Sequence, residues 1–454
     1  MTSNEQPELR ILLSLALPLA AAQAGNQLMG FVDTAMVGRI GTASIGGVGI
    51  GNGLFFAFTC FGLGVVLGMD APTAQALGAG EMPRARLVLS RGLRVAFWLA
   101  LPLTACVLLS PLGLGPAGVE PGTAHETARF LHGRAAGVLP FLLFVALRSH
   151  LQARALTRSI IIATVVGNAV NVALNVPLIF GDRALVWLGL PPLGLPPLGA
   201  LGSGISSAVA GVTMAAVLAL AVRAALQGAG PAADPAEGPA LQRTILRLGV
   251  PAGLQLVAEV AVFATVALLA GRLGRDAAAA HQIAITLASF TFTIALGVAQ
   301  ATSVRVGHHV GAGDTAHARH AGLVGIGVGV GIMAASALTF VCIPEPLARL
   351  FSSEPAVVAA AAPLIRIAAC FQIFDGIQVV AAGALRGAGD TRLPLYANLF
   401  GYYAVALPLA IALGVLGPFG AAGLWWGLCA GLVVVSALLL WRFLRVSARP
   451  IARV

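Results

Sequence analysis

Three carboxylic acids stand inside long apolar stretches of this chain, where a charge is costly. Asp33 lies in LMGFVDTAMVG, Glu259 in AGLQLVAEVAVFATVALL and Asp375 in ACFQIFDGIQVVAAG. An ionisable group inside a membrane span costs several kcal/mol unless it faces a water-filled cavity or a partner. Carboxylates in such positions can bind a proton, a metal cation or an organic cation. We therefore predict that the three acids form cation-binding sites.

Each acid also has a structural interpretation that the sequence leaves open. Asp33 could mark the interfacial end of its helix. Glu259 is too central for that, but it could make a hydrogen bond between helices. Asp375 could pair with Arg366, two to three turns before it on the same helix.

Amide side chains accompany the acids. TVVGNAVNVALNVPLIF carries Asn168, Asn171 and Asn175, and Gln255 and Gln282 lie in later apolar stretches. Asn171 and Asn175 are four residues apart and therefore share one helix face. Amide and carboxylate oxygens suit a small hard cation. Hydrogen bonding between helices explains the asparagines almost equally well.

Other ligand patterns are weak. A loop that contains arginines also holds His308, His309, His317 and His320, but no cysteine or acid completes a defined ligand set. The five cysteines lie within or at the ends of apolar segments and form no CxxC pair. This arrangement favours packing over disulfides or zinc.

The elements that must position these residues are membrane-spanning helices. The chain is 58% apolar and 10% charged, with a mean hydropathy of +0.92. Runs of about 20 apolar residues suit helices that cross the hydrocarbon core, and such continuous runs exclude the alternating strands of a barrel. We expect twelve spans, near residues 10–37, 43–69, 92–112, 129–149, 157–181, 200–223, 244–270, 277–304, 319–343, 356–385, 392–414 and 419–445.

The net charge of +10 is explained by membrane topology. All 27 basic residues are arginines, and they cluster in alternate loops and at the C-terminus. This bias places both termini in the cytoplasm, as expected for a bacterial inner-membrane protein. A nucleic-acid partner would need a folded domain with one basic face, which the sequence lacks. The stretch from Ile11 to Ala24 resembles a signal peptide, but Glu5 and Glu8 precede it, so we interpret it as the first span.

The two halves of the chain repeat each other at an offset of 233 residues. RILLSLALP at 10–18 matches RTILRLGVP at 243–251, and the loop at 78–81 matches the loop at 311–314. Further on, Thr157-Arg158 matches Thr391-Arg392, one residue out of step. The expected domains are an N-lobe over 1–226, a cytoplasmic linker over 227–241 and a C-lobe over 242–454. Two similar halves around a midplane cavity are common among transporters.

The repeat does not extend to the acids. The partner of Glu259 at this offset is Asn26, and the partner of Asp33 is Val266. The halves therefore share a fold but not a site, which we expect if the two lobes have separate binding roles.

Five segments resemble the NorM-type branch of the multidrug and toxic compound extrusion (MATE) transporters. They are FVDTAMVGRIG, LGVPAGLQLVAEVAVFATVALLAGRLG, AAHQIA, SVRVGHHVGAGD and FQIFDGIQVVAAGALRGAGDTRLP. The resemblance implies twelve helices in two pseudo-symmetric six-helix lobes around a central cavity. It implies export of cationic, amphipathic drugs in exchange for Na⁺ or H⁺, with no cofactor and with the protein acting as a monomer in the lipid bilayer.

The resemblance also assigns roles to individual residues. Asp33, Asn171 and Asn175 match the cation-coupling site of the N-lobe. Glu259, Gln282 and Asp375 match the C-lobe positions for cation and drug binding, and Asp33 is a further candidate for contact with the drug. Na⁺ ligation would fall to Glu259 and Asp375. The chain departs from the family at Phe371, where a tyrosine is frequent, and at Ser203, where some members have a cysteine.

Three other functions fit less well. A flippase or exporter of a lipid-linked metabolite would need a basic cavity for its diphosphate, whereas the predicted interior is acidic. A membrane-embedded transferase would need paired carboxylates such as DDxxD, which are missing, so we expect a transporter and not an enzyme. A passive channel would need a repeated pore-loop motif, and none is present.

Overall fold

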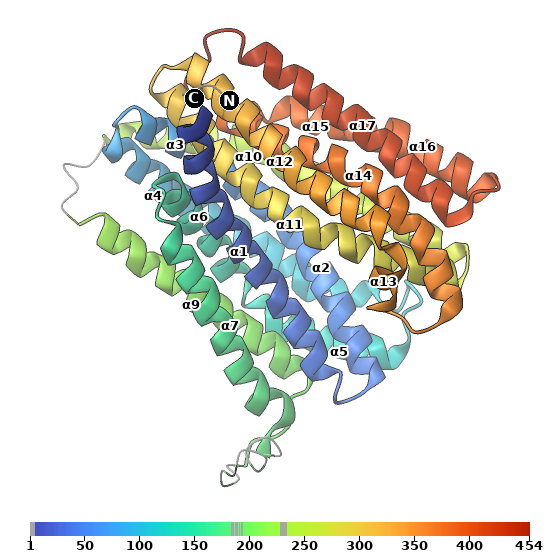
Figure 1. Cartoon of the computed structure of the whole chain (residues 1–454). Coiled ribbons are helices and arrows are strands. Elements are labelled where there is room, and N and C mark those ends of the chain that lie inside the picture. Colours follow the sequence, from blue (N-terminus) through green and yellow to red (C-terminus); the bar gives the residue numbers. More distant parts are fainter. Residues whose placement is uncertain (1–4, 183–185, 187–188, 190, 192–193, 228–233) are drawn as a thin grey trace. The chain divides into compact units, whose positions relative to one another are not determined.

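The computed structural model describes residues 5–182, 186, 189, 191, 194–227 and 234–454, and in these ranges it consists of helices and their connections (Figure 1). Residues 228–233 of the predicted linker lie outside the described residues. The main helices are α1 (Glu5–Val37), α2 (Thr42–Leu67), α3 (Asp70–Gly78), α4 (Met82–Leu109), α5 (Pro121–Ala135), α6 (Val138–Ala153), α7 (Thr157–Phe180), α9 (Ala200–Ala225), α10 (Gly238–Arg272), α11 (Arg275–Gly311), α12 (Thr315–Cys342), α13 (Pro344–Arg349), α14 (Pro355–Gly387), α15 (Arg392–Asn398), α16 (Leu407–Ala410) and α17 (Gly420–Val446).

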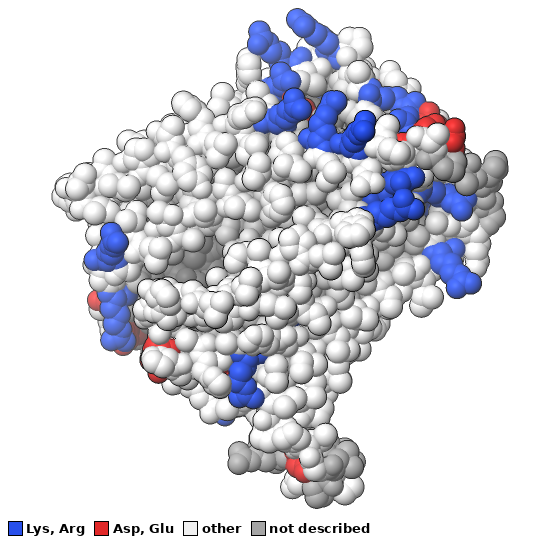
Figure 2. Space-filling view, turned by 180° about the vertical axis from the view of Figure 1, so that it is seen from behind, with Lys and Arg blue, Asp and Glu red and all other residues white. Residues whose placement is uncertain are grey.

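The predicted membrane-spanning fold is confirmed. Eleven helical stretches in the described residues are long and apolar enough to cross a membrane, and each coincides with a predicted span. In the view of Figure 2, most of the surface carries neither acidic nor basic side chains, and the arginines gather in separate groups towards its margins. Such a surface suits contact with lipid.

The predicted span at 129–149 was wrong as one continuous helix. It is replaced by α5 and α6, which meet at a bend of 51°. The bend lies at Ala136 and Gly137, where the Gly137 N–H donates to the carbonyl of Arg134 in a tighter turn. The predicted span at 392–414 is continuous through α15 and α16, but it contains π-helical segments at Leu399–Ala406 and Ile411–Leu416.

The sequence repeat has a conformational counterpart in four loops. Gly80, Gly313 and Gly389 have φ of 75°, 76° and 85°, and Ala155 at the fourth equivalent loop has φ of 59°. In each loop the next residue donates a backbone hydrogen bond to a carbonyl five residues earlier, for example Asp314 to His309. The residue in the left-handed conformation and this hydrogen bond together end the preceding helix, because they give its last carbonyls hydrogen-bond donors.

The structure contains two compact units, each with its own interior. One unit comprises Met1–Ala21, Asp70–Glu81 and Val250–Val454, and the other comprises Ala22–Met69 and Met82–Gly249. The first is called the C-unit here and the second the N-unit. Because short segments of the first half belong to the C-unit, the units are not identical to the predicted lobes 1–226 and 242–454, whose boundaries stay a prediction.

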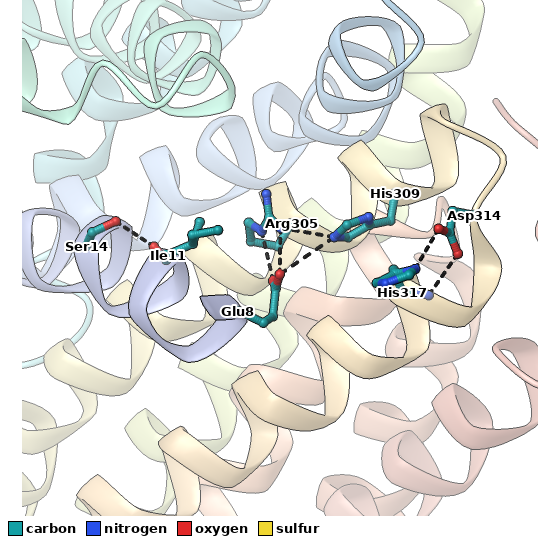
Figure 3. Close-up of polar contacts among 7 residues, drawn as sticks. All are labelled: Glu8, Ile11, Ser14, Arg305, His309, Asp314 and His317. Carbon is teal, nitrogen blue, oxygen red and sulfur yellow. Dashed lines mark hydrogen bonds and ion pairs between the residues drawn. The ribbon is translucent and has the colours of Figure 1, made fainter. Parts of the chain in front are cut away.

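Helices α11, α12, α14 and α17 form the centre of the C-unit, where α14 packs against the other three (Figure 1). The start of α1 is fastened to this group by an ion pair. Arg305 on α11 donates to both oxygens of Glu8, from Nε over 2.8 Å and from Nη2 over 2.6 Å (Figure 3). Nη2 also lies 3.1 Å from Nε2 of His309. Glu8 therefore holds the N-terminal helix in place.

Candidate functional site

Asp33 lies at the centre of a polar cluster inside the N-unit. It is on α1, four residues before the end of that helix, and it is fully buried. Its Oδ1 accepts hydrogen bonds from Nδ2 of Asn171 at 3.0 Å and from Nδ2 of Asn175 at 2.8 Å. Its Oδ2 accepts a bond from the hydroxyl of Ser207 on α9. The Asp33 side chain is therefore enclosed by the protein, and the alternative of an interfacial acid near the end of the helix stays a prediction.

The regular spacing on α7 produces this cluster. Asn171 and Asn175 are one turn apart and aim at the same carboxylate, as the sequence predicted, and Nδ2 of Asn175 also donates to Oδ1 of Asn171 at 3.2 Å. Asn171 Nδ2 lies 3.2 Å from the Ser207 oxygen, which joins α7 to α9. Three donors compensate one negative charge, so an ionised Asp33 is stabilised in the apolar interior.

Two oxygens beside this cluster are unused. Oδ1 of Asn175 and the hydroxyl of Ser203 are buried and find no hydrogen-bond partner within the described residues. A buried polar atom without a partner costs about 1–3 kcal/mol. These oxygens can coordinate a small cation, or accept a hydrogen bond from a protonated Asp33, once the Asp33 cluster rearranges.

Arg134 is a charged neighbour of the cluster that the sequence did not reveal. It stands in the last turn of α5, and its guanidinium carbon lies 4.6 Å from the centre of the Phe55 ring on α2. The charge of Asp33 acts on this guanidinium. From its sequence position Arg134 resembles an ordinary loop arginine, because the bend after α5 cannot be recognised in a continuous apolar run.

Glu259 anchors a second site, inside the C-unit. Gln378 on α14 is a polar neighbour of the Glu259 carboxylate. The hydroxyl of Tyr402 donates to Oε1 of Gln378 at 3.3 Å, and Tyr402 is fully buried. Three helical stretches thus meet at one carboxylate. The predicted alternative of a hydrogen bond between helices at Glu259 stays a prediction.

Asp375 is the second acid of this site. It lies on α14 one turn before Gln378, is 4% exposed, and its charge acts on that of Glu259. Arg366 is exposed and takes part in none of the ion pairs that the described residues form. The predicted alternative of an Asp375–Arg366 bridge is therefore wrong, and two carboxylates share an apolar interior without a paired cation.

Aromatic rings surround the second site. Phe263 packs edge-on against Phe371 at 6.2 Å and against Tyr402 at 6.1 Å, measured between ring centres. Trp425 packs against Phe371 at 5.8 Å and against His281 at 5.9 Å. Phe371, where the family often has tyrosine, thus belongs to this aromatic group, and the hydroxyl near the acids comes from Tyr402 instead.

Two other residues singled out in the sequence, Gln282 and His317, form hydrogen bonds with residues that belong to neither site. Gln282 is exposed, and its Nε2 donates to Thr286 on its own helix at 3.3 Å. His317 donates from Nδ1 to Asp314 at 2.6 Å, and its ring stacks on that of His309 (Figure 3). Over the described part of the chain, no group of three His, Cys, Asp or Glu residues could hold a metal ion.

Comparison with known proteins agrees with this architecture. The MatE family model matches residues 18–176 and again residues 251–412, so it recognises both halves. The chain is 36% identical to a probable multidrug resistance protein NorM of Deinococcus radiodurans, over 98% of this chain and 96% of the relative. It is 34% identical to the multidrug resistance protein PmpM of Pseudomonas aeruginosa, over 98% and 93%.

Solved structures share the fold. The eukaryotic MATE transporter AtDTX14 superposes with a TM-score of 0.86 at 21% identity, over 97% of this chain and 96% of that one. The Vibrio cholerae MATE transporter VcmN in its bent form superposes with a TM-score of 0.83 at 17% identity, over 98% of both chains.

Proposed function

Since this chain belongs to the MatE family of multidrug efflux transporters, we propose that it exports cationic, amphipathic compounds in exchange for Na⁺ or H⁺. The observation that carries the proposal is the Asp33 cluster. A fully buried carboxylate that receives hydrogen bonds only from neutral donors, and forms no ion pair within the described residues, is suited to bind a cation.

The chemistry of the Asp33 cluster suits a small coupling ion. When Asp33 is ionised, its carboxylate accepts hydrogen bonds from Asn171, Asn175 and Ser207. A bound cation or proton removes the negative charge and withdraws the carboxylate from at least one donor. The cluster therefore has two hydrogen-bonding arrangements that differ in charge, and a ligand that favours one of them shifts the conformational equilibrium.

The Glu259–Asp375 site suits the organic cation. Two carboxylates supply negative charge, and Phe263, Phe371 and Trp425 supply ring faces and apolar area. A cation over an aromatic ring gains about 0.5–2 kcal/mol, and the same carboxylates can accept Na⁺ or a proton in place of the drug. Competition between drug and coupling ion for these acids would drive exchange by alternating access.

The distribution of arginines supports an orientation with both termini in the cytoplasm of a bacterial inner membrane. In this orientation the Glu8–Arg305 pair lies at the cytoplasmic end of the C-unit. We further propose that the protein acts as a monomer.

Efflux from proteoliposomes tests the function. Ethidium transport is measured under an imposed Na⁺ gradient and then under an imposed pH gradient, for the wild type and for Asp33→Asn, Glu259→Gln and Asp375→Asn. One gradient should drive efflux by the wild type, and each variant should reduce the rate by about tenfold or more. Asp276→Asn, an exposed acid at the start of α11, is the matched control and should transport at the wild-type rate.

Native-rate efflux by the three acid variants would contradict the proposed coupling. A protein that moves a lipid-linked diphosphate but no organic cation would instead favour the flippase alternative.

A further inference from the structure

Arg134 is the buried charged group that the proposed mechanism leaves unused. Its Nε and Nη1 atoms are inaccessible to solvent, and neither finds a hydrogen-bond acceptor among the described residues. The guanidinium instead lies over the Phe55 ring. A buried cation without an anionic partner costs several kcal/mol, and one cation–π contact returns only part of that cost.

Close packing of α5 on α9 fixes the place of this arginine. A Cβ atom added to Gly204 would lie 2.9 Å from the backbone nitrogen of Arg134, and one added to Gly133 would lie 2.6 Å from the carbonyl oxygen of Leu201. Only glycine permits such an approach of two helix backbones. Ser207, which donates to Asp33, stands one turn after Gly204 on the same helix. Arg134 is thus held beside the helix that supports the Asp33 carboxylate.

Asp33 is the acid that the packing connects to Arg134, because Ser207 donates to Asp33 from the helix whose Gly204 packs against the Arg134 backbone. The acid on α5 itself, Glu126, lies two turns away and pairs with Arg129 at 3.4 Å. Asp33 and Arg134 form no ion pair in the described structure, because the oxygens of Asp33 already accept bonds from Asn171, Asn175 and Ser207. The two charges therefore interact at a distance, because neutral groups occupy the hydrogen-bonding positions of the Asp33 carboxylate.

We propose that Arg134 is the fixed counter-charge of Asp33 and that it limits how tightly the Asp33 cluster holds its coupling cation. This inference rests on the proposed antiport function. A positive charge near the carboxylate repels any cation that binds there, and in an apolar interior this repulsion is weakly screened. A transporter must release its coupling ion as well as bind it, and Arg134 favours the release.

The test measures cation affinity directly. A fluorescent organic cation is bound to the purified protein in nanodiscs, and the coupling ion is titrated until half of the dye is displaced. Arg134→Met should lower this half-effect concentration about tenfold, a change of about 1.4 kcal/mol in cation binding. Arg134→Lys keeps the charge and should stay within about twofold of the wild type. Arg134→Gln is the second neutral variant if the methionine variant does not fold.

A double-mutant cycle separates an electrostatic role from a structural one. In the Asp33→Asn background, Arg134→Met should leave the half-effect concentration unchanged, since the carboxylate charge is already gone. The control is Arg39→Gln, which removes one positive charge from an exposed position six residues after Asp33 and should have no effect.

Two results would overturn the role of Arg134 alone. One is an unchanged half-effect concentration in both neutral variants, and the other is a shift that persists in the Asp33→Asn background. If Asp33→Asn itself responded to the cation as the wild type does, the proposed coupling function would fail, and this inference with it.

Discussion

Asn175 donates a 2.8 Å hydrogen bond to Asp33, a residue 142 positions earlier in the chain and buried within the same unit. The bond joins α7 to α1 at the one point where α1 carries an acid in its apolar stretch. A hydrogen bond to an ionised group is worth more than a neutral one because the carboxylate has lost its water. The folding stability of the N-unit therefore depends on whether Asp33 is ionised.

Asn175→Ala tests that dependence. The variant removes one of three donors, which should lower the free energy of unfolding by about 1.5–3 kcal/mol while Asp33 is ionised. The variant also removes the Asn175 Oδ1 oxygen, a proposed ligand of the coupling cation, so the cluster should bind that cation more weakly. Thermal unfolding in detergent and cation-dependent dye displacement measure the two effects. Asn168→Ala is the matched control, since Asn168 donates only to the carbonyls of Gly25 and Thr164.

Tyr402→Phe tests the relay that ends at Glu259. The hydroxyl donates to Gln378, and Gln378 is a polar neighbour of the Glu259 carboxylate, so loss of the hydroxyl should weaken dye binding about two- to tenfold, equal to the 0.5–1.5 kcal/mol of one neutral hydrogen bond. Tyr396→Phe removes an exposed hydroxyl six residues earlier in the same apolar stretch and should leave dye affinity unchanged. Equal affinities in both variants and the wild type would show that Tyr402 does not support the acid.

The sequence predicted the N-unit cluster better than its surroundings. Spacing alone placed Asn171 and Asn175 on one helix face, and the family resemblance joined them to Asp33. Ser207 was not found, because α9 carries several serines and only packing selects one of them. Tyr402 could not be found either, since π-helical turns shift the register of its helix. Gln282 is exposed, and its role in drug binding stays a prediction.

The Glu8–Arg305 pair should contribute to stability more than an exposed pair does. Its two side chains are 10% and 16% exposed, and the guanidinium binds both carboxylate oxygens. Arg305→Met leaves the largely buried Glu8 with only His309, at 3.8 Å, as an ion-pair partner and should cost about 2–4 kcal/mol of unfolding free energy, measured by denaturant titration. Arg275→Met breaks an exposed pair with Glu354 and should cost at most about 0.5 kcal/mol. Similar losses in the two variants would contradict a fastening role for Glu8.

Asp314 should make a pH-dependent contribution at the start of α12. Its carboxylate accepts a hydrogen bond from the backbone N–H of His317, and this bond holds the pKa of Asp314 below its ordinary value. The folded state thus favours the ionised form. The resulting stability is present above the unfolded-state pKa, near about 4, and is lost as the pH falls through the lower folded-state pKa.

Two substitutions separate this charge from the helix cap. Asp314→Ala should cost about 1 kcal/mol at neutral pH, whereas Asp314→Asn keeps a capping oxygen and should cost less. From about pH 5 down to about pH 3 the stability difference between the wild type and Asp314→Asn should shrink, because only the aspartate titrates. A difference that stayed constant over this range would show that the carboxylate charge contributes nothing.

Among the four repeated loops, the loop at Ala155 should contribute least to stability. Ala155 adopts a φ of 59°, where a Cβ atom approaches the following carbonyl oxygen, while the equivalent residues Gly80, Gly313 and Gly389 have no Cβ. Ala155→Gly should therefore raise the free energy of unfolding by about 0.5–1 kcal/mol, the relief of strain being partly offset by the greater freedom of glycine in the unfolded chain. Gly313→Ala is the reverse experiment: an added Cβ meets no atom within 4 Å, so any loss of about 1 kcal/mol must come from the backbone conformation alone. Thermal unfolding of both variants is measured in one detergent. Stabilisation by Ala155→Gly together with destabilisation by Gly313→Ala would establish that the repeated loops preserve a backbone conformation. A stabilising Gly313→Ala would refute this conclusion.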